Sequence, residues 1–108
     1  GVLQDPNQAF FWYQKAADQG NAMAQFNLGL MYENGVGAVK DPEQAIIWYQ
    51  KAADQGYVNA QFNLGHMYAL AIGVAKDLKK AKYWVKKASD NGFEEASELW
   101  KKLELWKY

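Results

Sequence analysis

Apolar residues recur every three or four positions along most of the chain, which is the spacing of one face of an α-helix. In one segment, the apolar and aromatic side chains stand at i, i+3, i+4, i+7 and i+8, namely Ala45, Trp48, Tyr49, Ala52 and Ala53. The pattern predicts an all-α protein with six helices, near residues 6–19, 22–34, 42–55, 58–70, 77–91 and 94–107.

The helical pattern is also an internal repeat. The residues from Trp12 to Gly20 return unchanged from Trp48 to Gly56, and those from Ala24 to Gly29 return from Ala60 to Gly65, in both cases 36 positions later. A looser third copy keeps Asp77, Ala81, Trp84 and Gly92 in the same register. A period of this length is typical of a solenoid made of stacked helix pairs.

The repeat divides the single domain of residues 1–108 into four parts. We expect a partial repeat without its first helix at 1–20, full repeats at 21–56 and 57–92, and a polar-backed capping helix at 93–108. Gly1 aligns with Gly37 and Gly73, so the chain is expected to open in the loop that follows a first helix.

Each full repeat contains a first helix, called helix A here, and a second, called helix B. Asp41 and Pro42 stand where an N-cap and first helical residue belong, and Gly56 is placed to end that helix B. Gly29 and Gly65 lie inside the A helices, where glycine costs about 1 kcal/mol relative to alanine. We therefore expect a close helix crossing at each glycine, with Ala45 and Ala81 as the facing residues.

Composition narrows the functional classes. The 12 basic residues, all lysine, equal the 12 acidic residues in number, and the chain contains no cysteine. Because arginine supplies the planar fork that suits phosphate and guanine, its absence argues against nucleic acid as a partner. No apolar run approaches the roughly 20 residues of a membrane-spanning helix, so no membrane partner is expected. The cellular compartment remains open.

Catalytic and metal chemistry find little support. The chain has two serines, Ser89 and Ser97, no threonine and one histidine, His66, and none of them belongs to a nucleophile–base motif. Nothing at metal-ligand spacing accompanies His66, so no metal and no cofactor are expected. Lysines crowd the third helix B, between Lys76 and Lys87, and are interpreted as a solvated face rather than a phosphate site.

The repeated residues resemble the Sel-one-like repeat (SLR), a relative of the tetratricopeptide repeat with a longer loop between its helices. The resemblance rests on the run from Ala24 to Tyr32, on Gly35-Val36-Gly37, on Asp41 to Ala45, and on Trp48 to Gly56. It covers nearly the whole chain. It implies a right-handed α/α superhelix of antiparallel helix pairs whose concave face, lined by the A helices, binds a protein or an extended peptide.

The candidate binding residues are positions on the A helices outside the Leu, Gly and Tyr stripe, together with the aligned Lys102 of the capping helix. They are Met23, Phe26, Asn27, Leu30, Glu33, Asn59, Phe62, Asn63, His66 and Lys102. Phe26 and Phe62 have an equally weighted structural interpretation, as wedges between neighbouring helices. The leading hypothesis is a non-catalytic adaptor or scaffold module. The alternative is a structural segment that associates with itself, for instance through the aromatic first helix.

Overall fold

The computed structural model describes residues 5–108, and this part of the chain is helical with no strand. Its elements are α1 (Pro6–Asp18), α2 (Ala22–Asn34), α3 (Pro42–Asp54), α4 (Val58–Leu70), α5 (Leu78–Asp90), α6 (Glu94–Lys102) and a short 3-10 helix, η2 (Leu105–Lys107). The expectation that rested on Gly1 lies outside the described residues.

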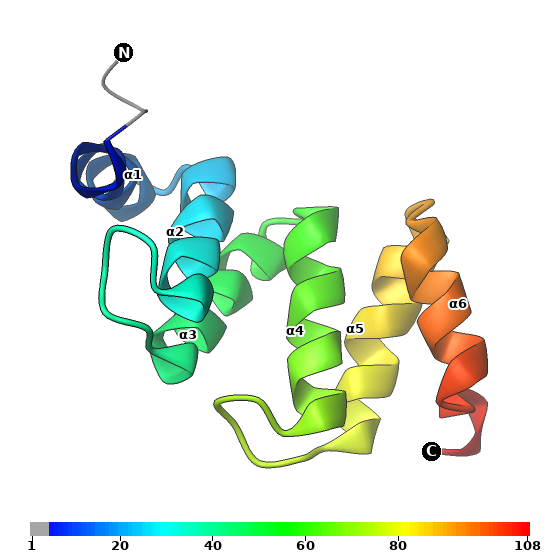
Figure 1. Cartoon of the computed structure of the whole chain (residues 1–108). Coiled ribbons are helices and arrows are strands. Elements are labelled where there is room, and N and C mark those ends of the chain that lie inside the picture. Colours follow the sequence, from blue (N-terminus) through cyan, green and yellow to red (C-terminus); the bar gives the residue numbers. More distant parts are fainter. Residues whose placement is uncertain (1–4) are drawn as a thin grey trace.

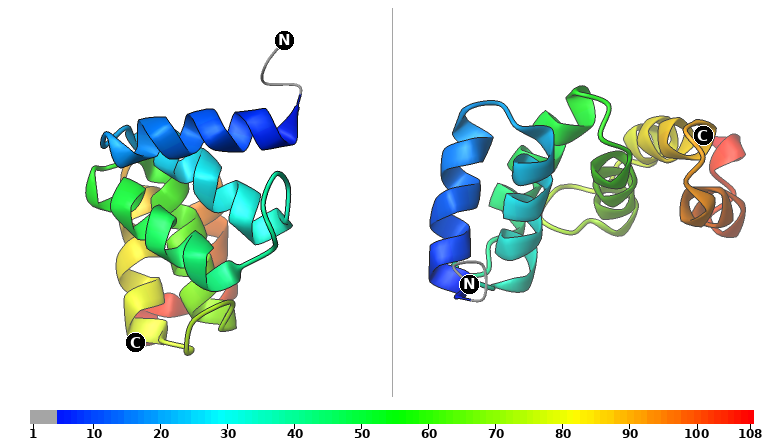
Figure 2. Two further views of the ribbon diagram at one scale, coloured as in Figure 1. Left: turned by 90° about the vertical axis from the view of Figure 1, so that its left-hand side faces the viewer. Right: turned by 90° about the horizontal axis from the view of Figure 1, so that it is seen from above.

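The helices form an elongated row measuring 45 × 24 × 20 Å. Each helix packs mainly against its neighbours in sequence, and the contacts of α2 with α3 and of α4 with α5 are the most extensive. The helix axes turn along the row, since α1 is seen end-on in Figure 1 whereas α4, α5 and α6 run upright. The two views of Figure 2 show the same curved succession of antiparallel helices. The predicted solenoid is confirmed.

The B helices begin as the sequence predicts. The carboxylate of Asp41 accepts a hydrogen bond from the backbone N–H of Gln44 at 3.2 Å, and Asp77 accepts one from Lys80 at 3.0 Å. Asp5 caps α1 in the same way. These caps satisfy N–H groups that the first helical turn leaves without a partner, and so they fix where each helix B starts.

The close crossings exist, but their facing residues differ from the expectation. A Cβ placed on Gly29 would lie 2.5 Å from Cε1 of Tyr49, and one on Gly65 would lie 2.8 Å from Cγ2 of Val85. The prediction of Ala45 and Ala81 as the nearest facing residues is therefore wrong. Both alanines are fully buried one turn earlier on the same helices.

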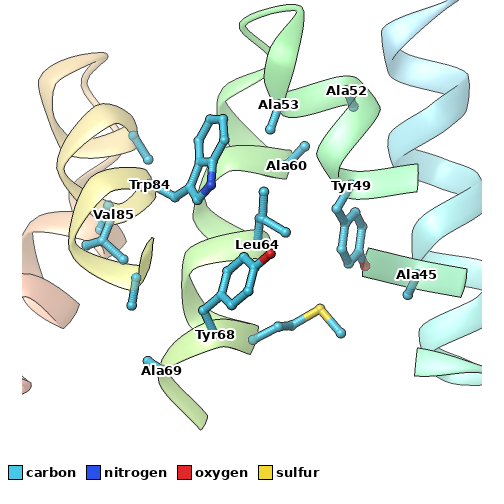
Figure 3. Close-up of a cluster of buried hydrophobic side chains, with 14 of the residues drawn as sticks. Ala45, Tyr49, Ala52, Ala53, Ala60, Leu64, Tyr68, Ala69, Trp84 and Val85 are labelled. Atoms are coloured by element: carbon cyan, nitrogen blue, oxygen red, sulfur yellow. The ribbon is translucent and has the colours of Figure 1, made fainter. Parts of the chain in front are cut away.

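The core runs along the row between the helix pairs. Tyr49 of α3 and Trp84 of α5 lie on either side of Leu64 in α4 (Figure 3), and Leu64 is completely buried. Leu28 of α2 is equally buried and belongs to a second cluster with Trp48. The predicted apolar stripes of the two full repeats are thus confirmed as core.

Two buried glutamines join successive helices at their ends. Gln25 Nε2 donates to the backbone oxygen of Ala17 at 3.2 Å, and its Oε1 accepts from Gln55 Nε2 at 2.9 Å. In the next repeat, Gln61 Nε2 donates to the backbone oxygen of Ala53 at 3.4 Å. These bonds tie α2 to the ends of α1 and α3, and α4 to the end of α3.

The last helix is shorter than predicted. α6 ends at Lys102 instead of continuing to 107, Glu104 adopts a left-handed conformation with φ of 50°, and η2 follows. This break turns the chain back toward α5, where Leu105 becomes completely buried. The burial of one leucine in this position is the physical reason why a straight cap does not form.

We expect Gly29→Ala to lower the free energy of unfolding by about 1–3 kcal/mol, because the added methyl group overlaps the Tyr49 ring. The higher helix propensity of alanine, about 1 kcal/mol, offsets only part of this overlap. Urea unfolding followed by circular dichroism measures the change. In a Tyr49→Ala background the penalty should largely disappear, and a penalty that persists unchanged there would contradict the assigned crossing.

Candidate functional site

The candidate residues lie on α2, α4 and α6, as the helical spacing requires. Met23, Asn59 and Lys102 are exposed. The remaining seven are half-buried, namely Phe26, Asn27, Leu30 and Glu33 on α2 and Phe62, Asn63 and His66 on α4.

A hollow of about 360 Å³ lies between α4 and α6. Its lining residues are Phe62, His66, Glu95, Glu98, Leu99 and Lys102. Three of these are predicted site residues, and Glu98 aligns with Phe62 in the repeat register. Glu95 and Leu99 were missed, although the same register aligns them with the candidates Asn59 and Asn63.

Two residues that line this hollow, Phe62 and His66, belong to a row of stacked aromatic rings. The Phe62 ring stacks on the His66 ring with a centroid distance of 6.0 Å, and on the Phe93 ring at 5.0 Å. In the preceding repeat, Phe26 contacts Tyr57 at 5.2 Å. Both phenylalanines therefore contact the residue just before the next helix A, and the wedge interpretation describes their packing. Phe62 still leaves part of its ring at the hollow.

The hollow has charged groups at its rim. Glu95 and Glu98 lie on α6 with Lys102. Among the described residues, the ion pair joins Glu104 to Lys107, and no lysine nitrogen lies within 4.0 Å of the carboxylate of Glu95 or Glu98. The hollow thus combines an apolar floor from Phe62 and Leu99 with carboxylates that remain available to a cationic group.

The candidate residue Glu33 already forms a hydrogen bond within the protein. The hydroxyl of Tyr49 donates a hydrogen bond to Glu33 Oε1 at 2.6 Å. Burial raises the pKa of Tyr49 far above its ordinary value, and the bond to Glu33 and its negative charge raise it further, whereas the nearby Asn63 side chain lowers it. The Tyr49 hydroxyl on α3 therefore lies beside side chains of two A helices, Glu33 of α2 and Asn63 of α4.

A second hollow, of about 380 Å³, lies along α5 alone. Four lysines, Tyr83 and Asp90 line it, and Lys87 Nζ donates to the Tyr83 hydroxyl at 2.9 Å. One helix supplies every lining residue, so this hollow is the space between long exposed side chains. It is the lysine-rich face that the sequence identifies, and it contains none of the candidate residues.

The comparison with protein families identifies the chain. The Sel1 repeat family matches residues 1–21, 22–57 and 58–93, and the two longer matches have the 36-residue period of the sequence. This chain belongs to the Sel1 repeat family. No curated protein matches it significantly.

Several solved structures are similar to this chain. A Sel1 repeat protein from Oxalobacter formigenes is 43% identical with a TM-score of 0.81, over 83% of this chain and 37% of that one. A protective antigen present in uropathogenic Escherichia coli strains, which displays an SLR fold, is 40% identical with a TM-score of 0.81, over 82% of this chain and 19% of that one. The matched part of the chain therefore spans 37% and 19% of the lengths of these two proteins.

A third similar structure is closer in length. Helicobacter pylori cysteine-rich protein B is 30% identical, with a TM-score of 0.79, over 83% of this chain and 68% of that one. These bacterial relatives confirm the SLR solenoid. Sel1 repeats generally build non-enzymatic scaffolds for protein–protein interaction.

Two properties of the described chain bear on other kinds of function. Over residues 5–108, no helix is both long enough and apolar enough to cross a bilayer. In the same range, no three His, Cys, Asp or Glu side chains come together as a metal ion would require.

We expect the Tyr49 hydroxyl to make stability depend on pH above about 10, the ordinary pKa of tyrosine. Because the folded protein holds the Tyr49 proton more tightly than the unfolded chain does, this stability is complete below pH 10 and is lost as the pH rises further. Urea unfolding between pH 9 and about 11 should show a steeper decline for the wild type than for Tyr49→Phe. Equal slopes would contradict the raised pKa.

Proposed function

We propose that this chain is a non-catalytic module that binds an extended segment of a partner protein along the face formed by α2, α4 and α6. The hollow between α4 and α6 is the observation that carries the proposal. Its apolar floor suits one side chain of the partner, and its carboxylates at Glu95 and Glu98 favour a basic residue beside that anchor. The membership of the chain in a family of interaction scaffolds supports this function.

The amides of Asn27 and Asn63 are the proposed grips on the partner's backbone. They occupy equivalent positions on successive A helices and are half-buried, and the Asn63 side chain also lies beside the Tyr49 hydroxyl. An amide offers both a donor and an acceptor, as a peptide bond does. Packed helices lie about 8–10 Å apart and an extended chain advances about 3.3 Å per residue, so the two amides suit backbone groups roughly three residues apart.

The alternative function is a structural one, in which the repeats build a rod that associates with itself. The exposed indole of Trp12 on α1 favours this alternative. A self-associating rod needs no free groove, so the effect of groove substitutions on peptide binding separates the two functions.

Peptides selected from a random display library against the whole chain provide the test. We expect the Asn27→Ala, Asn63→Ala double variant to bind them about 1–3 kcal/mol more weakly, from two neutral hydrogen bonds of about 0.5–1.5 kcal/mol each. Its circular dichroism should match that of the wild type. Phe11→Ala, which removes an exposed ring from α1, is the matched control and should bind normally.

Undiminished binding by the double variant would show that the two amides do not grip the peptide. Unfolding of the variant would show that they are structural. Either result removes the groove assignment. Replacing Glu98 with lysine should also reduce the basic residues among newly selected peptides, because it reverses one of the two negative charges at the hollow.

A further inference from the structure

The helix α1 exposes a surface that the equivalent helices bury. The side chain of Trp12 is 48% exposed, whereas Trp48 and Trp84 at the same repeat position are each 8% exposed. Tyr13 and Ala16 are also half-buried, whereas Tyr49 and Ala52 are completely buried. We call Trp12, Tyr13 and Ala16 the α1 face.

A neighbouring position shows that this exposure is specific to one face. Phe11, Ile47 and Tyr83 are equivalent residues and are 57%, 46% and 54% exposed. Their side chains point outward in every repeat. Only the α1 face differs, so it lacks the kind of cover that α3 and α5 receive.

In the other two repeats, a glycine-bearing helix provides that cover. α2 brings Gly29 against the Tyr49 ring, and α4 brings Gly65 against Val85. Tyr13 aligns with Tyr49, so a helix that covers α1 with the same geometry must present a residue without a side chain opposite the Tyr13 ring.

In each helix A, the residue four positions after the crossing glycine varies together with the helix B residue that faces this glycine. Tyr49 faces α2, where Glu33 accepts its hydrogen bond. In the next repeat, valine replaces the tyrosine at position 85 and Ala69 replaces the glutamate. The hydroxyl and its acceptor are therefore both present or both absent. None of the hydrogen bonds within residues 5–108 involves the hydroxyl of the half-buried Tyr13. Once a covering helix displaces solvent from this hydroxyl, a carboxylate on that helix would serve as its acceptor.

We propose that the α1 face is a docking site for one further helix, which carries a glycine opposite Tyr13 and a carboxylate four residues after that glycine. A second folded copy of this chain does not offer such a helix. Gly29 and Gly65 are already covered by their own B helices, and α6 has Lys101 at the equivalent position. This site is separate from the groove of the proposed function.

A peptide with the sequence of residues 21–36 is the probe, because it contains both Gly29 and Glu33. Titrated into the whole protein, it should shift the indole N–H resonance of Trp12, which a Trp12→Phe variant identifies among the five tryptophans. Glu33→Ala in the peptide should weaken binding about tenfold, since the buried Tyr13 hydroxyl then lacks an acceptor. Gly29→Leu in the peptide should abolish binding.

The protein variants give the reciprocal test. Tyr13→Val, which copies the residue at position 85, should bind the wild-type and Glu33→Ala peptides equally well. Phe11→Ala should keep the wild-type preference. Isolated helices of this length form poorly in water, so the same peptide is also fused ahead of Gly1 through a flexible linker, which raises its effective concentration.

Three results would overturn the proposal. The first is an unchanged Trp12 resonance with both the free and the fused peptide. The second is equal binding of the wild-type, Gly29→Leu and Glu33→Ala peptides. The third is a dimer, detected by sedimentation equilibrium, whose formation shifts the Trp12 resonance without any peptide. The occupant of the α1 face would then be a second copy of the chain.

Discussion

The whole arrangement depends on the absence of a side chain at Gly29 and Gly65. At these positions α2 approaches α3, and α4 approaches α5, so closely that even a methyl group would overlap the facing side chain. The approach at Gly29 brings the Tyr49 ring across the helix pair, and its hydroxyl then reaches Glu33 and Asn63 on the A helices. A contact in the core therefore determines which side chains of the proposed binding face remain free for a partner.

Much of the fold could be predicted from the sequence because the residues that begin, pack and end each helix occur more than once, at a fixed spacing. The cap residues, the stripes and the glycines all recur at 36 residues, and the structure confirms the elements they mark. The partner of Gly29 could not be found by matching small residues. A helical side chain leans toward the N-terminus of its helix, so Tyr49 covers the surface over the turn that contains Ala45.

Two other features depend on tertiary contacts that periodicity does not describe. The residues of α6 continue a helical pattern, yet the chain leaves the helix so that Leu105 can be buried against α5. In the candidate site, the repeat register led to Phe62, His66 and Lys102. It did not indicate that Leu99 would join Phe62 in one hollow, because that depends on the distance between α4 and α6.

The buried glutamines have a consequence for binding. Gln25 and Gln61 hold the ends of consecutive helices together with neutral amides, and at the opposite ends the loop glycines Gly37 and Gly73 press against Pro6 and Pro42. The angle between repeats is thus fixed at both edges of the row. A partner bound as proposed would meet a groove that is already preorganised, so the protein would lose little additional conformational entropy.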